Sequence, residues 1–286
     1  MKRHRRFLMT RNTRMTSKPH PLIIEPKDLE AELGDSDLLL VDLSQPQTYV
    51  QYHLPGAVFL EYAWIIHIEQ PRMGLLPDAA QLSNVLSAMG LTDTTHVVAY
   101  DDEGGGRACR FLWTLDVVGH TNFSLLNGGL HAWANEGHQV TSEIYYPSKT
   151  QYKAEIHPEP MADRQYILDH LHNDKIAILD TRSPQEYAGI KVFAQRGGHI
   201  PGAINIEWTE AMDKSRNMRL KPENELRELL ETHGITRDKE IITHCQTHHR
   251  SAHTYILLKS LGYAKVKGYP GSWSDWGNDA STPIEN

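Results

Sequence analysis

The chain carries one sequence pattern twice, and this internal repeat limits its fold more than any other feature. The matched landmarks are Asp42 with Asp180, the HLPGA segment at 53–57 with HIPGA at 199–203, and Trp133 with Trp276. Their order is the same in both halves. Because self-similarity of this kind marks a duplicated structural unit, the 286 residues predict two related domains.

The two units are expected to join near Tyr145 to Lys149, a polar segment that contains proline, as linkers usually do. We therefore assign residues 1–20 to a basic tail, 21–146 to the first domain and 147–286 to the second. The segment between the aspartate and the histidine is longer in the second half, which predicts an inserted loop at 189–198.

The basic tail is rich in Lys and Arg and contains no acidic residue. We expect a disordered extension, although an Arg-rich start is also typical of mitochondrial presequences and Met15 offers a second translation start. The apolar run at 7–9 is too short for a secretory signal, and no stretch approaches the roughly 20 apolar residues of a membrane span. These features predict a cytoplasmic protein.

Each half alternates short apolar runs with helical stretches. The runs lie at 38–41, 97–100, 176–179 and 241–243, and the helical stretches at 79–89, 223–233 and 252–261, with Gly90, Gly234 and Gly262 as stops. Apolar runs without alternation are typical of strands that are buried on both faces. The sequence therefore predicts an α/β fold in which each domain has a central parallel sheet flanked by helices.

Cys245 follows one of these predicted strands and precedes a helix, for which Ser251 is the expected N-cap. Ligands bind at this end of parallel strands. The helix dipole and Arg250 should lower the thiol pKa from its usual value of about 8.5, so we predict that Cys245 is a catalytic nucleophile. Cys109 is the other of the two cysteines. It lies in the predicted helix 107–118 and is expected to be a buried packing residue.

The first half has Asp101 at the position of Cys245, followed by an acidic, glycine-rich loop at 102–106. A carboxylate cannot carry a transferable sulfur atom, and an acidic loop repels an anionic donor. The first domain is therefore expected to be catalytically silent.

These motifs together resemble the tandem-domain rhodanese (thiosulfate sulfurtransferase) family, from about Pro21 to Gly277. The resemblance rests on the aspartate at the strand end, the HIPGA segment, the loop CQTHHR at 245–250 and GSWSDW at 271–276. The loop is most similar to that of bacterial members. The resemblance implies that Cys245 takes sulfane sulfur from a donor such as thiosulfate and passes it, as a persulfide, to cyanide or another thiophilic acceptor. It implies neither a metal nor an organic cofactor.

The predicted substrate-binding residues are Gln246, Thr247, His248, His249 and Arg250, with Trp208 as a further pocket residue. Glu186 stands where family members can have an Arg that grips the donor, which favours thiosulfate over 3-mercaptopyruvate. Arg182 is expected to pair with carboxylates at the strand end. Structural roles are expected for the remaining landmarks: His53 and His199 at turns, and Trp133, Trp273 and Trp276 in the core.

Three other functions share parts of this pattern. A phosphatase of the same fold would use an HC-x5-R loop, which is one residue longer. A metal site would use His244, Cys245, His248, His249 and His253, although five residues around one helix start cannot all converge. A sulfur-binding module without turnover is the third.

The net charge of −7 argues against nucleic-acid binding, so the expected partners are a small sulfur donor, a thiophilic acceptor and a protein sulfur acceptor.

Overall fold

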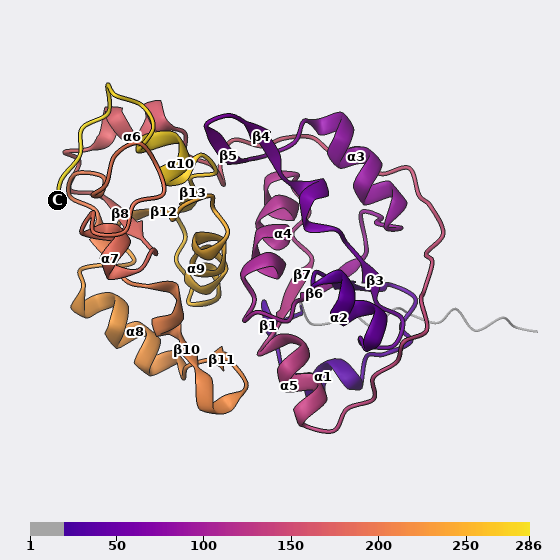
Figure 1. The fold of residues 1–286 in the computed structure, drawn as a ribbon. Coiled ribbons are helices and arrows are strands. Elements are labelled where there is room, and N and C mark those ends of the chain that lie inside the picture. The colour runs from indigo at the N-terminus through magenta and orange to yellow at the C-terminus, as the bar shows by residue number, and fades with distance from the viewer. Residues whose placement is uncertain (1–19) are drawn as a thin grey trace, which may run out of the picture.

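The computed structural model describes residues 20–286, which form two α/β halves joined by an extended segment (Figure 1). The first half contains β1 (Ile23–Ile24), α1 (Pro26–Glu30), β2 (Leu38–Asp42), α2 (Pro46–Gln51), β3 (Val58–Phe59), η1 (Tyr62–Ile65), β4 (His67–Glu69), β5 (Arg72–Leu75), α3 (Ala79–Ala88), β6 (His96–Tyr100), α4 (Gly106–Val117), β7 (Phe123–Leu126) and α5 (Gly129–Asn135). The second half contains α6 (Arg164–His170), β8 (Ile176–Asp180), α7 (Pro184–Tyr187), β9 (Ile204–Asn205), η2 (Trp208–Ala211), β10 (Met212–Asp213), η3 (Lys214–Arg216), β11 (Arg219–Leu220), α8 (Glu223–Thr232), β12 (Glu240–His244), α9 (Arg250–Ser260), β13 (Val266–Gly268) and α10 (Ser272–Trp276). The predicted basic tail at 1–20 lies outside the described residues except for His20.

Each half is built on a parallel sheet, as the apolar runs predicted. The first sheet has the strand order β1-β7-β6-β2-β3 and the second has β13-β12-β8-β9, and all neighbouring strands are parallel. The two halves share a register, since Asp42 lies beside Tyr100 and Asp180 beside His244 at the strand ends. The predicted fold class is confirmed in both halves.

The predicted helix ends are also confirmed. Gly90, Gly234 and Gly262 have φ values of 82°, 75° and 80°, the left-handed region in which glycine ends a helix at little cost. The expected N-cap at Ser251 is wrong. Helix α9 begins at Arg250 with His249 as its N-cap, two residues earlier than expected, so Ser251 lies inside the first turn and its hydroxyl is free for another partner.

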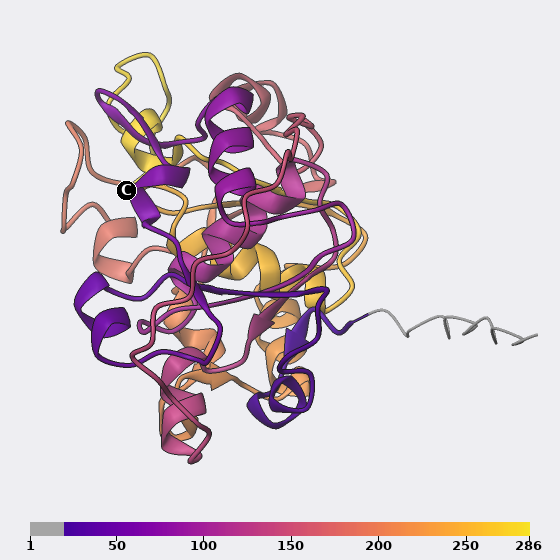
Figure 2. The same ribbon diagram turned by 90° about the vertical axis from the view of Figure 1, so that its right-hand side faces the viewer.

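Residues 136–163 join the halves and contain neither helix nor strand. This segment runs along the outer side of the first half (Figures 1 and 2). Ser83 and Ser87 of α3 accept backbone N–H groups from Ala154 and Tyr152, both at 2.9 Å, and Ala162 then reaches the second sheet by donating to the Gly268 carbonyl at 2.9 Å. The predicted join at 146/147 falls within the segment and stays a prediction.

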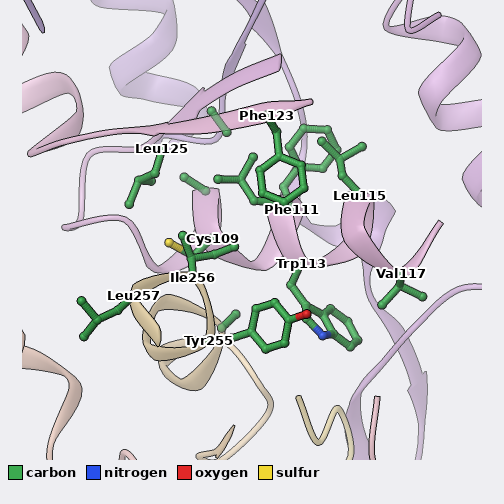
Figure 3. Close-up of a cluster of buried hydrophobic side chains, with 14 of the residues drawn as sticks. Cys109, Phe111, Trp113, Leu115, Val117, Phe123, Leu125, Tyr255, Ile256 and Leu257 are labelled. Carbon is green, nitrogen blue, oxygen red and sulfur yellow. The ribbon is translucent and has the colours of Figure 1, made fainter. Parts of the chain in front are cut away.

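The two halves meet through equivalent helices, α4 and α9, which pack against each other. Their contact belongs to one buried apolar cluster that includes Cys109, Trp113 and Tyr255 (Figure 3). Cys109 is fully buried there, as expected for a packing residue. The domain interface is thus continuous with the hydrophobic core of the first half.

No helix among residues 20–286 combines the length and the apolar character that crossing a membrane would take.

Candidate active site

Cys245 begins the loop between β12 and α9, at the carboxyl end of its strand. Its thiol is fully buried. The Ser251 hydroxyl and the backbone amides of Ser251 and Thr247 stabilise the thiolate, because they lie at the helix start and direct hydrogen-bond donors to the sulfur. The sulfur therefore lies in a cradle of donors formed by its own loop.

The charge balance of this cradle favours the thiolate. Burial raises the pKa of the Cys245 thiol, but the Arg250 cation and the hydrogen bonds from Ser251 and Thr247 outweigh it, so that the pKa falls from 9.0 to about 7. A thiol with this pKa is substantially ionised at neutral pH. Because the thiolate is the nucleophilic form, Cys245 has the chemistry of a reactive cysteine.

Ser272, at the start of α10, fixes the shape of the loop. Its hydroxyl oxygen accepts the backbone N–H groups of Cys245 at 3.2 Å and His248 at 3.1 Å, and it donates to the Tyr269 carbonyl at 2.7 Å. Both His248 and Ser272 have left-handed backbones, with φ values of 54° and 49°. Such φ values are costly for residues with a Cβ and point to a functional constraint on the loop.

Arg250 is paired with a carboxylate that lies 64 residues away in the chain. It donates to both oxygens of Glu186, at 2.7 and 2.8 Å, and Glu186 also bonds to the Ser183 hydroxyl at 2.9 Å. Burial raises the pKa of Glu186, but the Arg250 and Ser183 contacts outweigh it and lower the pKa to about 2. The Arg250 cation is thus held beside the thiol but directed towards Glu186.

The other predicted site residues divide into two groups. Gln246 donates to the Phe193 carbonyl of the inserted loop at 3.2 Å, and the Trp208 ring lies 5.9 Å from the ring of His249, so Gln246 contacts the inserted loop while Trp208 lies beside His249. The His248 side chain is fully buried against Trp113, with ring centroids 4.4 Å apart. The structure therefore places the His248 imidazole in the domain interface, where its Nδ1 bonds to the Ser251 hydroxyl at 2.8 Å.

Several contacts to the loop come from the first half and were not predicted. Arg110 of α4 is fully buried and donates to the carbonyls of Thr247 at 3.3 Å, His248 at 3.4 Å and Leu75 at 3.2 Å. The Glu103 carboxylate forms a hydrogen bond with the His249 ring. No local sequence signal marks Arg110 or Glu103 as site residues, because both reach the loop across the domain interface.

Two glycines of the first half allow this approach. A Cβ on Gly74 of β5 would lie 2.2 Å from the Thr247 carbonyl oxygen, and a Cβ on Gly106 would lie 2.6 Å from Nε2 of His249. Both distances are far shorter than a real Cβ contact. The absence of side chains at these positions lets the first half pack directly on the active-site loop.

Asp101 occupies the equivalent cradle in the first half. Its carboxylate accepts backbone N–H groups from Glu103 at 3.0 Å, Gly105 at 2.7 Å, Arg107 at 2.9 Å and Ala108 at 3.0 Å. Glu103 and Arg107 correspond in position to Thr247 and Ser251, whose amides stabilise the Cys245 thiolate. The same loop geometry thus surrounds a fixed carboxylate in one half and a thiol in the other.

The predicted structural residues behave as expected. Arg182 donates to both Asp180 oxygens and to the Gly198 carbonyl at 2.8 Å. His53 and His199 bond through Nδ1 to the carbonyls of Tyr49 at 2.6 Å and Tyr187 at 3.0 Å. Trp133, Trp273 and Trp276 are at most 1% exposed.

The histidines near Cys245 do not form a metal site. Across residues 20–286, the His, Cys, Asp and Glu groups able to hold a metal ion do not include any member of the loop or its neighbours. Burial lowers the pKa of both His244 and His253 to about 4, so these two rings are neutral side chains of the interior.

Comparisons with known proteins agree with this architecture. The family model described as "Rhodanese-like domain" matches residues 25–136 and 163–279. A thiosulfate sulfurtransferase of Azotobacter vinelandii is 48% identical over 265 residues, 93% of this chain and 97% of that protein, and one of Pseudomonas aeruginosa is 47% identical over the same coverage. The sulfur carrier protein TtuD of Thermus thermophilus is 34% identical, over 87% of this chain and 88% of its own length.

Among solved structures, an anaerobic ergothioneine biosynthesis enzyme from Chlorobium limicola superposes with a TM-score of 0.83 at 20% identity. The match covers 93% of this chain and 70% of that one, and at this identity it bears on the fold alone. The family model, by contrast, matches both halves separately, and the relatives align over nearly their whole length. The chain therefore belongs to the rhodanese family, as a tandem pair of rhodanese-like domains.

Proposed function

We propose that this chain is a thiosulfate sulfurtransferase that carries the transferred sulfur as a persulfide on Cys245. The observation that supports this best is the thiol with a pKa of about 7 inside a ring of amide and hydroxyl donors. The relatives named thiosulfate sulfurtransferase, at 47–48% identity over 93% of the chain, support the same donor.

The reaction balances without a cofactor. The Cys245 thiolate attacks the outer sulfur of thiosulfate, the bond between the two thiosulfate sulfurs breaks, and sulfite leaves with the electron pair. The enzyme then holds a persulfide anion. Cyanide attacks the terminal sulfur, the bond to the Cys245 sulfur breaks, and thiocyanate leaves while the thiolate is regenerated.

The proposed roles of the loop residues follow from their contacts. The amides of Thr247 and Ser251 and the Ser251 hydroxyl hold the thiolate, and after sulfur transfer they are available to the persulfide charge. Arg250 supplies the nearby cation, and Gln246, His249 and Trp208 are proposed to contact the donor or the acceptor. The first half is proposed to be catalytically silent, since Asp101 replaces the cysteine.

A protein sulfur acceptor is also proposed. The relative named sulfur carrier protein supports this, as does an exposed apolar loop beside Gln246, in which Ile190, Val192 and Phe193 are 78%, 46% and 55% exposed. We assign the chain to the cytoplasm, because a persulfide carrier depends on a reduced cysteine and both Cys109 and Cys245 are free thiols.

Intact-mass spectrometry after thiosulfate treatment tests the proposal. The wild-type chain and Cys109→Ala should each gain one sulfur atom, and Cys245→Ala should gain none. Adding cyanide should remove that sulfur and release an equal amount of thiocyanate. Sulfur on Cys109, or an unmodified wild-type chain that is still folded, would overturn the assignment.

A further inference from the structure

We propose that His20, Glu32 and His96 form a zinc site at the amino end of β6, the central strand of the first sheet, remote from the active site. His96 is the first residue of β6, whereas Asp101 follows the last residue of the same strand. The three residues therefore lie at the opposite end of the strand from the two facing loops. This function is separate from sulfur transfer.

The ligand atoms are already near one another. Nδ1 of His20 lies 3.6 Å from Oε2 of Glu32, Nδ1 of His96 lies 3.7 Å from the same oxygen, and all three atoms lie within 4.8 Å of each other. Zinc bonds to histidine nitrogen and carboxylate oxygen at about 2.0–2.2 Å in a tetrahedron, so neighbouring ligand atoms are roughly 3.4 Å apart. Only small movements separate the present positions from a coordination shell, with water as the fourth ligand.

The tautomer of His96 is the second and independent observation. The Ser124 hydroxyl donates its hydrogen to the Pro21 carbonyl at 2.6 Å, so it can only accept from Nε2 of His96, which lies 2.8 Å away. The proton of the ring is therefore on Nε2, and Nδ1 carries a lone pair. Metal-binding histidines are commonly oriented by such a hydrogen bond from their other nitrogen.

That lone pair is directed into the cluster and is not otherwise used. His96 is 3% exposed, and its Nδ1 has no hydrogen-bond partner among residues 20–286. A buried acceptor left unpaired destabilises the folded state, and a bound metal ion would remove that cost.

One rearrangement is required. The rings of His20 and His96 stack, with centroids 3.6 Å apart and planes at 14°, whereas a metal ion must lie near the plane of each ring. His96 is fixed by Ser124, but the His20 side chain is 30% exposed, so tilting His20 brings its Nδ1 onto the ion. Metal binding would then replace the stacking of the His20 and His96 rings with one coordinate bond from each ring, and would fix His20 beside the sheet.

The test is zinc binding by the full chain, stripped with a chelator, free of any affinity tag and carrying Cys245→Ala to remove the thiol as a ligand. Competition with a fluorescent zinc chelator should give one zinc per chain. Glu32→Gln and His20→Ala should each weaken binding at least tenfold, and Ser124→Ala should weaken it less, because Ser124 acts only through the His96 tautomer.

A second His–Glu pair, close to Glu32 in the chain, provides a matched control. Nδ1 of His138 lies 3.0 Å from Oε1 of Glu30, but residues 20–286 place no third ligand beside this pair, so Glu30→Gln and His138→Ala should bind zinc as tightly as the parent. Circular dichroism should show that every variant is folded. Zinc should also raise the melting temperature of the parent but not of Glu32→Gln. Absence of zinc binding, or binding that Glu32→Gln and His20→Ala leave unchanged, would overturn the proposal and leave the cluster as a stacked histidine pair beside a carboxylate.

Discussion

Arg250 and Glu186 form a two-point ion pair beside the reactive thiol, with both guanidinium–carboxylate distances below 3 Å. This pair determines how much of the Arg250 guanidinium is available to bind an anionic donor. A paired cation still favours the thiolate, but its hydrogen-bonding edge is occupied by Glu186. Donor recognition should therefore depend on how firmly Glu186 holds Arg250.

Glu186→Gln should release Arg250, because a neutral amide cannot match the two-point pair. We expect the KM for thiosulfate to fall by about three- to tenfold, equivalent to roughly 1 kcal/mol, and the use of 3-mercaptopyruvate to rise. Wild-type enzyme should prefer thiosulfate. Steady-state kinetics with both donors measure this, with the exposed Glu285→Gln as control. A wild-type preference for mercaptopyruvate would contradict the interpretation of Glu186.

Cys245→Ala should abolish sulfur transfer, while Cys109→Ala should keep most of it. Cys109 is packed in the interface between α4 and α9, and burial raises the pKa of its thiol well above the usual range, so it is not nucleophilic. Thiocyanate formation from thiosulfate and cyanide measures the outcome. An equal loss in two folded variants would show that Cys245 is not the only carrier.

The rate of sulfur loading should depend on pH around 7. The pKa of the Cys245 thiol is lowered from 9.0 to about 7, so the thiolate is present above this value and is lost as pH falls through it. Below pH 6, kcat/KM for thiosulfate should fall about tenfold per pH unit, and above pH 8 it should be level. Iodoacetamide labelling of Cys245 should follow the same curve, whereas a midpoint near 9 would exclude the proposed stabilisation.

Arg110 should affect catalysis although it belongs to the silent half. Arg110→Met removes three hydrogen bonds to carbonyls, two of them in the active-site loop, so we expect at least a tenfold loss in kcat/KM and a stability loss of about 2–4 kcal/mol. Arg110→Lys keeps the charge but not the fork of donors and should be intermediate. Chemical denaturation separates the two effects. Unchanged kinetics in folded Arg110→Met would show that the first half does not position the loop.

Loop size should decide between sulfur and phosphoryl chemistry. The loop from Cys245 to Arg250 has six residues, one fewer than the phosphatase pattern. Inserting one Gly between His249 and Arg250 should impair sulfur transfer and create weak aryl phosphatase activity or tighter oxyanion binding, because a wider ring of amides accommodates a larger anion. Kinetics of both reactions decide this, and sulfur transfer at the wild-type rate in the insertion variant would refute it.

The sequence predicts those features of the fold that depend on short, local residue patterns. The strand before Cys245, the helix after it and the stops at Gly90 and Gly234 follow from apolar runs and from the backbone preference of glycine. The predicted position of the helix start was wrong by two residues. Ser251 looked like an N-cap, but its hydroxyl bonds to Nδ1 of His248 at 2.8 Å and stabilises the Cys245 thiolate.

The contacts that shape the site could not be read from local pattern. Glu186 reaches Arg250 only when β8 and β12 are neighbours, and Ser272 reaches the loop only through the start of α10. Arg110 and Glu103 require the relative placement of two domains, which no periodicity encodes. Prediction from sequence therefore stops at contacts between residues far apart in the chain, both within the second half and across the domain interface.

The Asp101 carboxylate makes the first loop an anion receptor that is never vacant. Its four amide bonds hold a charge that is covalently part of the chain, so this loop cannot load or unload. Under the proposed function the second loop gains and loses a sulfur in every cycle. Because Glu103 of the first loop bonds to His249 of the second, each turnover takes place beside a loop that the reaction itself does not modify. The duplicated chain thus holds a permanent carboxylate in one copy of the loop and an exchangeable sulfur in the other.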